Sequence, residues 1–195
     1  MIKIFIMAIC FSLLFVMLAW FMLPKFLEQP KYKVVRKEND IEIRKYDKIL
    51  TSSVKVYGNQ YNALRKGFQP LVRYIGAKER DSEKISMTAP VIQTTNESEN
   101  WTVSFAMPSK YNIDNLPKPA NDEIYFEEIQ PSLAAVIRFS GVADTSLLTQ
   151  KASVLKRWLE LNGYTESSSP KFLFYNDPTT PGFLRRNEVM IIIDK

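Results

Sequence analysis

The chain has 195 residues, of which 46% are hydrophobic, so it is long enough for one domain of ordinary size with a packed core. It carries 26 Lys and Arg against 21 Asp and Glu, a formal charge of +5, and the interspersed signs are typical of a solvated surface and not of a nucleic-acid partner. There is no histidine and a single cysteine, Cys10, which excludes a disulfide framework, a Cys/His zinc site and the Ser-His-Asp and Cys-His catalytic pairs.

Residues 1–23 differ in composition from everything that follows. After Lys3 no charge occurs from residue 4 to residue 23. Twenty apolar residues, rising about 1.5 Å each in a helix, match the bilayer core of about 30 Å. The large side chains of Trp20, Phe21 and Met22 stand where a signal-peptidase site needs small ones. We therefore predict an uncleaved, single-pass transmembrane anchor, with a cleaved signal peptide as the alternative.

The orientation of this anchor is less determined. Lysines and arginines follow the apolar run while only Lys3 precedes it, so a count of positive charges would keep the domain in the cytoplasm. Very short N-terminal tails usually stay inside, which favours the opposite orientation. We expect an extracytoplasmic domain, with residues 24–30 as a linker and residues 31–195 as the domain.

The first half of the domain is predicted to form strands around one helix. Two strands are predicted within residues 32–47, around a turn at 38–40, and a third over residues 49–57. Gly58 and Asn59 open a helix that ends near Gly76. Strands follow within residues 85–94 and 101–108, and a last one at 124–129 within a mostly irregular stretch. Pro90 removes a ladder donor, which predicts a bulge or a sheet edge there.

The same order recurs in the second half. A strand over residues 133–140 ends at Gly141, Asp144 is the predicted N-cap of a helix that ends at Gly163, and two strands follow within residues 171–178 and 187–195. This recurrence predicts an α+β fold in which duplicated strand-helix-strand-strand units form a pseudo-twofold curved sheet or distorted barrel with two helices. A chance recurrence of element order is the alternative.

The helix expected at residues 59–76 mixes apolar and basic residues. At 100° per residue one face is apolar and is predicted to pack in the core: Leu64, Phe68, Leu71 and Ile75. Beside it lies an apolar strip edged by a cation, made of Tyr61, Phe68, Val72 and Arg65. Such a strip suits a flat apolar ligand with acidic groups. A solvated amphipathic helix, with arginine stems covering apolar surface, is the alternative.

Six segments in order carry a resemblance to a known family: residues 41–47 (IEIRKYD), 63–76 (ALRKGFQPLVRYIG), 85–91 (ISMTAPV), 103–111 (VSFAMPSKY), 134–141 (AAVIRFSG) and 175–189 (YNDPTTPGFLRRNEV). Together they resemble the SOUL haem-binding protein family over residues 31–195. The chain departs from it at Met190, where the family often has Trp. The resemblance implies a pseudo-twofold α+β barrel with two helices, in agreement with the duplication.

The resemblance also implies a function and a site. It implies that haem or a related tetrapyrrole binds non-covalently beside the first helix, with contacts at Arg65, Phe68, Val72 and Arg73. Histidine ligation of the iron is impossible here, and Tyr61 is the strip residue able to ligate ferric iron. The family implies a basic residue in the C-terminal loop of some members, but residues 179–182 contain no lysine.

We therefore expect a membrane-anchored binding protein without catalytic residues or a metal site. The first alternative is a module that binds another hydrophobic small molecule or a partner protein. The second is an enzyme acting on a small hydrophobic molecule, with Tyr and Glu residues as acid and base. Arg186 and Glu188, which alternate onto one face of the last predicted strand, are expected to form a structural ion pair.

Overall fold

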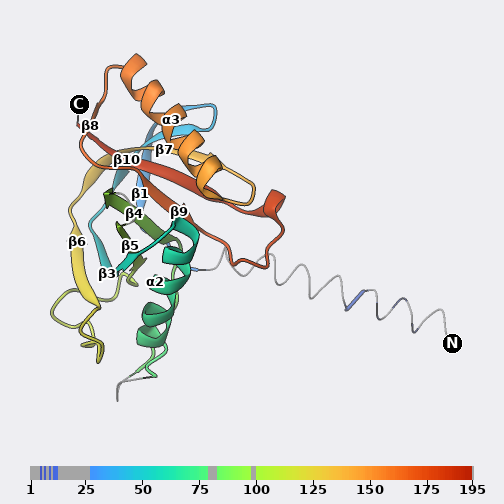
Figure 1. The fold of residues 1–195 in the computed structure, drawn as a ribbon, viewed down its shortest axis with the longest axis vertical. Coiled ribbons are helices and arrows are strands. Elements are labelled where there is room, and N and C mark those ends of the chain that lie inside the picture. Colours follow the sequence, from blue (N-terminus) through green and yellow to red (C-terminus); the bar gives the residue numbers. More distant parts are fainter. Residues whose placement is uncertain are drawn as a thin grey trace.

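The fold is a single curled antiparallel sheet with two helices packed on it (Figure 1). The computed structural model describes residues 27–78, 83–97 and 100–194, together with residues 5, 7, 9, 11 and 12. Its strands are β1 (Tyr32–Glu38), β2 (Ile41–Tyr46), β3 (Ile49–Tyr57), β4 (Val91–Glu97), β5 (Asn100–Ala106), β6 (Tyr125–Ile129), β7 (Ser132–Phe139), β8 (Thr165–Glu166), β9 (Lys171–Phe174) and β10 (Asn187–Asp194). Its helices are α2 (Gln60–Ile75), α3 (Thr145–Leu161) and the short 3-10 helix η2 (Gly182–Leu184).

The strand order confirms the predicted duplication. The order is β1-β2-β7-β10-β9-β4-β5-β3-β6, and β8 pairs with β10. It is symmetric about the central β9–β4 pair, because β10 and β5 flank that pair and β7 and β3 lie outside them. Each half runs strand, helix, strand, strand, and each helix follows a glycine with a positive φ, 117° at Gly58 and 119° at Gly141. β1 and β6 are the two ends of this strand order. Among the described strands they are not paired with each other, so the curled sheet does not close and forms a half-barrel.

Both predicted helix starts are confirmed by their caps. The Asn59 side chain accepts a hydrogen bond from the Asn62 amide at 3.0 Å, and the Asp144 side chain accepts one from the Leu147 amide at 2.8 Å. Each cap satisfies one of the amides that the first helical turn leaves without a partner. The local sequence therefore determines where both helices begin.

Both helices cover the same face of the sheet. Gln93 of β4 pairs with Phe172 on β9, a residue of the core under α3, and with Val103 on β5, a residue of the core under α2. The other face carries a third apolar cluster, in which Tyr46 of β2 and Ile49 of β3 lie together although their strands are distant in the sheet order. Residues from distant strands meet only inside a curl, so this cluster fills the concave face.

The buried face of α2 is only partly the predicted one. Leu71 and Ile75 are buried as expected, and Ala63, Gly67 and Tyr74 are buried with them. Leu64 and Phe68 pack against this core but are only half-buried. The reason is Gly67, where a Cβ would lie 2.6 Å from the Cβ of Val103. The absence of a side chain lets the helix lie directly on β5 and turns Phe68 towards the helix edge.

Gly67→Ala is expected to lower the free energy of unfolding by about 1–3 kcal/mol, because the new methyl group overpacks against Val103. Helix propensity alone predicts the opposite sign, a gain of roughly 1 kcal/mol. Urea unfolding curves measure the difference, and the exposed neighbour Lys66→Ala serves as control, with a change within about 0.5 kcal/mol. A neutral or stabilising Gly67→Ala would show that the helix does not need this close approach.

Two local expectations need correction, and two short elements were not foreseen. The strand predicted within residues 85–94 begins only at Val91, directly after Pro90, and β4 is a central strand and not a sheet edge. Proline therefore ends the irregular segment before the strand instead of interrupting the ladder. Neither β8 nor η2 was expected, since both are too short to produce a periodic pattern.

The predicted anchor, residues 1–23, lies mostly outside the described residues. Within the described part of the chain, no helix has both the length and the apolar character needed to span a bilayer. The anchor remains a prediction.

Candidate functional site

A half-open hollow of about 460 Å³ lies at the edge of α2. Four parts of the chain form it: α2, the segment that leads into β4, the loop that leaves β9, and Leu27 in the segment that enters the domain. The residues that line it are mostly apolar: Leu27, Tyr61, Leu64, Arg65, Phe68, Gln69, Met87, Thr88, Ala89, Val91, Phe174, Tyr175, Asn176, Asp177 and Pro178. A volume of this size with an apolar lining is typical of small-molecule sites.

The structure brings together three of the five predicted site residues. Tyr61, Arg65 and Phe68 all line this hollow. Val72 is half-buried and packs against the core under α2. Arg73 lines a different hollow, of about 470 Å³, on the other side of the helix. The ligand contacts predicted for these residues remain predictions.

Phe68 is the central apolar side chain that α2 supplies to the hollow. Its ring packs edge-on against Phe105 of β5, with ring centroids 5.2 Å apart. Because Gly67 lies flat on the sheet, Phe68 is held at the margin between the core and the hollow. Arg65 precedes it by less than one turn and is exposed, so a cation borders the apolar surface.

The rest of the lining was missed from the sequence. Met87, Thr88 and Ala89 belong to the ISMTAPV segment, and Tyr175 to Pro178 belong to the YNDP segment. Both segments contributed to the family resemblance, but the site was assigned to the helix alone. The signal that could have found them is that both are irregular, proline-containing segments next to strands of the central β4–β9 pair.

Tyr175 connects the hollow to a buried ion-pair network on the concave face. Glu188 is 0% exposed and Arg44 is 2% exposed. The Arg44 guanidinium donates to both Glu188 carboxylate oxygens, at 2.8 and 3.1 Å. Arg186 donates to the same carboxylate at 2.8 Å, and the Tyr175 hydroxyl donates to it at 2.9 Å. The predicted Arg186–Glu188 pair is confirmed, and Arg44 is its unpredicted third member.

The network keeps Glu188 charged. Burial alone would raise the pKa of the Glu188 carboxyl, but the hydrogen bonds and charges of Arg44 and Arg186 outweigh burial and hold that pKa below its ordinary value. Burial raises the pKa of Tyr175 well above its ordinary value, and the adjacent Glu188 carboxylate adds to this. The Tyr175 hydroxyl in the hollow wall is therefore a fixed donor.

Stability is expected to fall on acidification below pH 4.5, the ordinary pKa of a glutamate. The unfolded chain takes up a proton at Glu188 there, whereas the folded chain resists it, so the contribution of Glu188 is complete above pH 4.5 and is lost as pH falls through the lower folded pKa. Unfolding free energies measured from pH 7 to pH 3 test this. Glu188→Gln, which has no proton to bind, should lose less stability over that range; an equal loss would assign the acid sensitivity to other groups.

The loop that leaves β9 has its own cation. Arg185 donates to the Pro178 carbonyl at 2.6 Å and to the Thr180 carbonyl at 2.7 Å. These bonds bring the returning arm of the loop, residues 184–186, beside Pro178 in the wall of the hollow. The Arg185 guanidinium therefore braces the loop from within.

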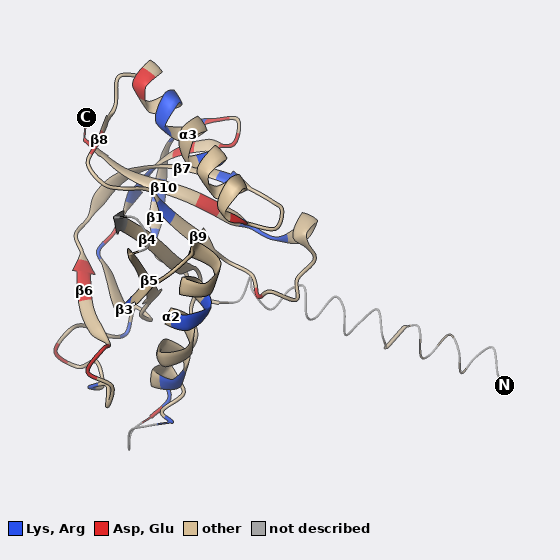
Figure 2. Ribbon diagram, viewed as in Figure 1, with Lys and Arg blue, Asp and Glu red and all other residues tan. Residues whose placement is uncertain are grey.

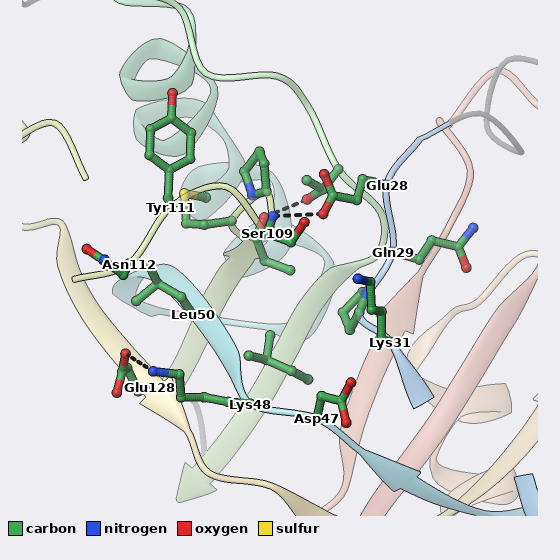
Figure 3. Close-up of a pocket in the computed structure, with 16 residues that line it drawn as sticks. Glu28, Gln29, Lys31, Asp47, Lys48, Leu50, Ser109, Tyr111, Asn112 and Glu128 are labelled. Atoms are coloured by element: carbon green, nitrogen blue, oxygen red, sulfur yellow. Dashed lines mark hydrogen bonds and ion pairs between the residues drawn. The ribbon is translucent and has the colours of Figure 1, made fainter. Parts of the chain in front are cut away.

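A third hollow, of about 310 Å³, lies where the chain enters the domain and is lined by both charged and apolar residues (Figure 3). Its charges are largely paired: Lys48 contacts Glu128 at 2.9 Å, and the Glu28 carboxylate accepts a hydrogen bond from the Ser109 amide at 2.7 Å. Lys31 and Asp47 also line it. The hollow joins the entering segment to β3 and to the loop after β5.

Charged residues elsewhere in the described part of the chain do not form one large patch of a single sign. In Figure 2 the charged positions on α2 are all basic, whereas α3 and the strands carry both signs. Among residues 27–78, 83–97 and 100–194, no group of three or more metal-ligating side chains is positioned to hold a metal ion.

Comparison with known proteins supplies a family and a fold. The family model described as SOUL heme-binding protein matches residues 27–192. Heme-binding protein 1 of Xenopus laevis is 29% identical over 158 residues, which cover 77% of this chain and 82% of that protein. Heme-binding protein 2 of Homo sapiens is 26% identical over 162 residues, which cover 79% of this chain and 78% of that protein.

Solved structures share the architecture at low identity. The C-terminal domain of EcmrR has a TM-score of 0.63 at 14% identity, over 84% of this chain and 98% of that chain. A hydrolase from Listeria innocua has a TM-score of 0.55 at 10% identity, over 82% of this chain and 94% of that chain. Likeness at such identities concerns the fold alone.

Proposed function

The chain belongs to the SOUL haem-binding protein family, and from this membership we propose that its domain binds haem or a related tetrapyrrole, non-covalently, in the apolar hollow beside α2. One observation carries the proposal: a hollow of about 460 Å³ joins an apolar floor at Phe68 to a cation at Arg65. A porphyrin has the matching chemistry, with a flat apolar ring and acidic propionates at one edge.

The apolar character of the lining residues matches that of a porphyrin ring. Leu64 and Phe68 offer apolar contact from α2. Met87 and Val91 add to it from the segment that leads into β4 and from the start of β4, and Phe174 adds to it from the end of β9. The half-open form would cover part of the ring and leave the propionate edge near Arg65 and water. When bound, haem supplies an iron centre, and the protein residues supply apolar contact and one countercharge.

Coordination of the iron, if it occurs, needs a residue other than histidine, because the sequence has none. Three lining residues, Tyr61, Tyr175 and Met87, carry groups that ligate haem iron in other proteins, and the Tyr175 hydroxyl is already engaged by Glu188. Without a histidine bond we expect micromolar affinity, about 8 kcal/mol of binding free energy.

We propose a binding role without catalysis. Two tyrosines line the hollow, but the Tyr175 hydroxyl is engaged by Glu188, and its pKa lies well above the ordinary tyrosine value. A proton on such a group is not released near neutral pH, so Tyr175 is a poor general base. Another hydrophobic ligand is a second candidate, because the lining is mostly apolar and its two charged side chains, Arg65 and Asp177, have opposite signs.

Haemin titration followed by absorbance tests the proposal. A saturable change with one equivalent of haemin per chain supports it. Displacement of haemin by other apolar ligands would favour the second candidate, and a linear, unsaturable signal would contradict a specific site.

Arg65→Gln is expected to weaken haemin binding about two- to fivefold, since an exposed charge pair contributes roughly 0.5–1 kcal/mol. Arg73→Gln removes the same charge from the same helix but from a different hollow, so its dissociation constant should equal that of the wild type. Haemin titrations of both variants measure whether only the Arg65→Gln change weakens binding. Equal weakening would mean that net charge, and not the position of Arg65, attracts haemin.

We also propose that residues 4–23 anchor the protein in a membrane, with the domain on the extracytoplasmic side. The described residues of that run, Phe5, Met7, Ile9, Phe11 and Ser12, are helical, and the side chains of all five are exposed. Resistance to carbonate extraction tests the anchor, and protease digestion of sealed vesicles tests the side. A mature chain that begins near residue 23 would contradict the anchor but not the extracytoplasmic side, because a cleaved signal peptide also exports the domain.

A further inference from the structure

The apolar hollow lies at the point where the chain enters the domain. Leu27 lines the hollow. The next residue is held to the segment before β4, because Glu28 pairs with Thr88 in a parallel bridge and its carbonyl accepts a hydrogen bond from the Ala89 amide at 2.9 Å. Thr88 and Ala89 line the same hollow. The entering segment is therefore part of the wall and not a free tether.

This attachment limits how far the hollow can lie from the apolar run of residues 4–23. Only residues 24–26 separate Leu23 from Leu27. Four peptide steps, fully extended, span at most about 14 Å. A domain of this length is about 40 Å across. If residues 4–23 span a bilayer, the wall of the hollow lies within about a third of the domain's width of the membrane surface.

The rim of the hollow has the side chains that a membrane interface favours. Tyr61 is 66% exposed and Met87 is 43% exposed, although both line the hollow. The loop that continues from the hollow wall carries Phe183, which is 77% exposed, and Leu184. The bond from Arg185 to the Pro178 carbonyl keeps that part of the loop beside the wall. Aromatic rings and a cation such as Arg65 are typical of surfaces that meet lipid headgroups.

We propose that the face formed by the rim of the hollow and the 176–186 loop docks on the lipid bilayer, so that an apolar ligand passes between bilayer and hollow without crossing water. The passage of a ligand rests on the proposed function. The docking rests on the proposed anchor, through the short connection, and on the exposed apolar rim, and it does not depend on haem binding.

The test measures which face of the full-length chain meets lipid. In a Cys10→Ala background, Met87→Cys and Leu161→Cys each provide one site for an environment-sensitive fluorophore. Leu161 is 77% exposed and is the last residue of α3, whose C-terminal end lies at the opposite end of the domain from α2 in Figure 1. The labelled chains are reconstituted in phosphatidylcholine vesicles that contain a headgroup nitroxide lipid.

The expected result is several-fold stronger nitroxide quenching at residue 87 than at residue 161. Equal quenching at the two positions would overturn the proposal, as would failure of the chain to float with vesicles. Shielding of residue 87 in detergent that grows with protein concentration would assign the face to a second copy and also overturn it. Haemin titration of the unlabelled Cys10→Ala chain in detergent, which keeps Met87, separates the two proposals: selective quenching without haemin binding leaves docking supported and the proposed function refuted.

Discussion

Glu188→Ala is expected to lower the free energy of unfolding by about 3–5 kcal/mol, the largest effect of any single substitution considered. The carboxylate is fully buried and neutralises Arg44, which is itself buried, and Arg186. Its removal leaves the Arg44 charge inside the curl without its bidentate partner. Unfolding of residues 27–195 in urea, followed by tryptophan fluorescence, measures the loss.

The matched control is Glu128→Ala. Glu128 also belongs to an ion pair, with Lys48 at 2.9 Å, but both side chains are partly exposed. Its loss should cost no more than about 1 kcal/mol. The double replacement Arg44→Met with Glu188→Leu should recover part of the stability, because it removes the buried charge together with its partner. If Glu188→Ala costs no more than Glu128→Ala, the network does not stabilise the fold.

Phe68→Glu is expected to abolish haemin binding, with affinity at least about a hundredfold weaker, roughly 3 kcal/mol. The substitution places a carboxylate on the apolar floor of the hollow, where the macrocycle is proposed to lie. It also removes the apolar contact that should supply much of the binding free energy. The absorbance titration proposed above measures the change.

Two variants keep this result interpretable. Phe68 also packs on Phe105, so Phe68→Leu tests the role of the aromatic ring with the apolar character kept, and we expect only a modest loss of affinity. Lys66→Glu adds a larger change of charge on the same helix outside the hollow and should leave binding nearly unchanged. If folded Phe68→Glu protein, verified by circular dichroism, binds haemin like the wild type, the ligand does not lie at this hollow.

Local patterns in the sequence determined the elements and their duplication. Turn residues, helix caps and alternating strands act between neighbours in the chain, so Asn59 and Asp144 located the two helix starts correctly. The recurrence at Gly58 and Gly141 predicted the symmetry of the sheet, because in both halves a strand ends at a glycine and a helix follows. The ion pair of Arg186 and Glu188 was also predictable, since two residues apart on a strand share a face.

Only the tertiary structure decided the composition of the site. The rotation of α2 depends on contact between Gly67 and Val103, which no helical projection contains, and this contact moves Phe68 to the helix edge. Arg65 and Arg73 line separate hollows, although the family resemblance had grouped them. The remaining walls come from residues 27, 87–91 and 174–178, which are brought together by strand pairing and by the entering segment. Such contacts join residues far apart in the chain, and a local sequence pattern does not indicate which distant segment will pack against it.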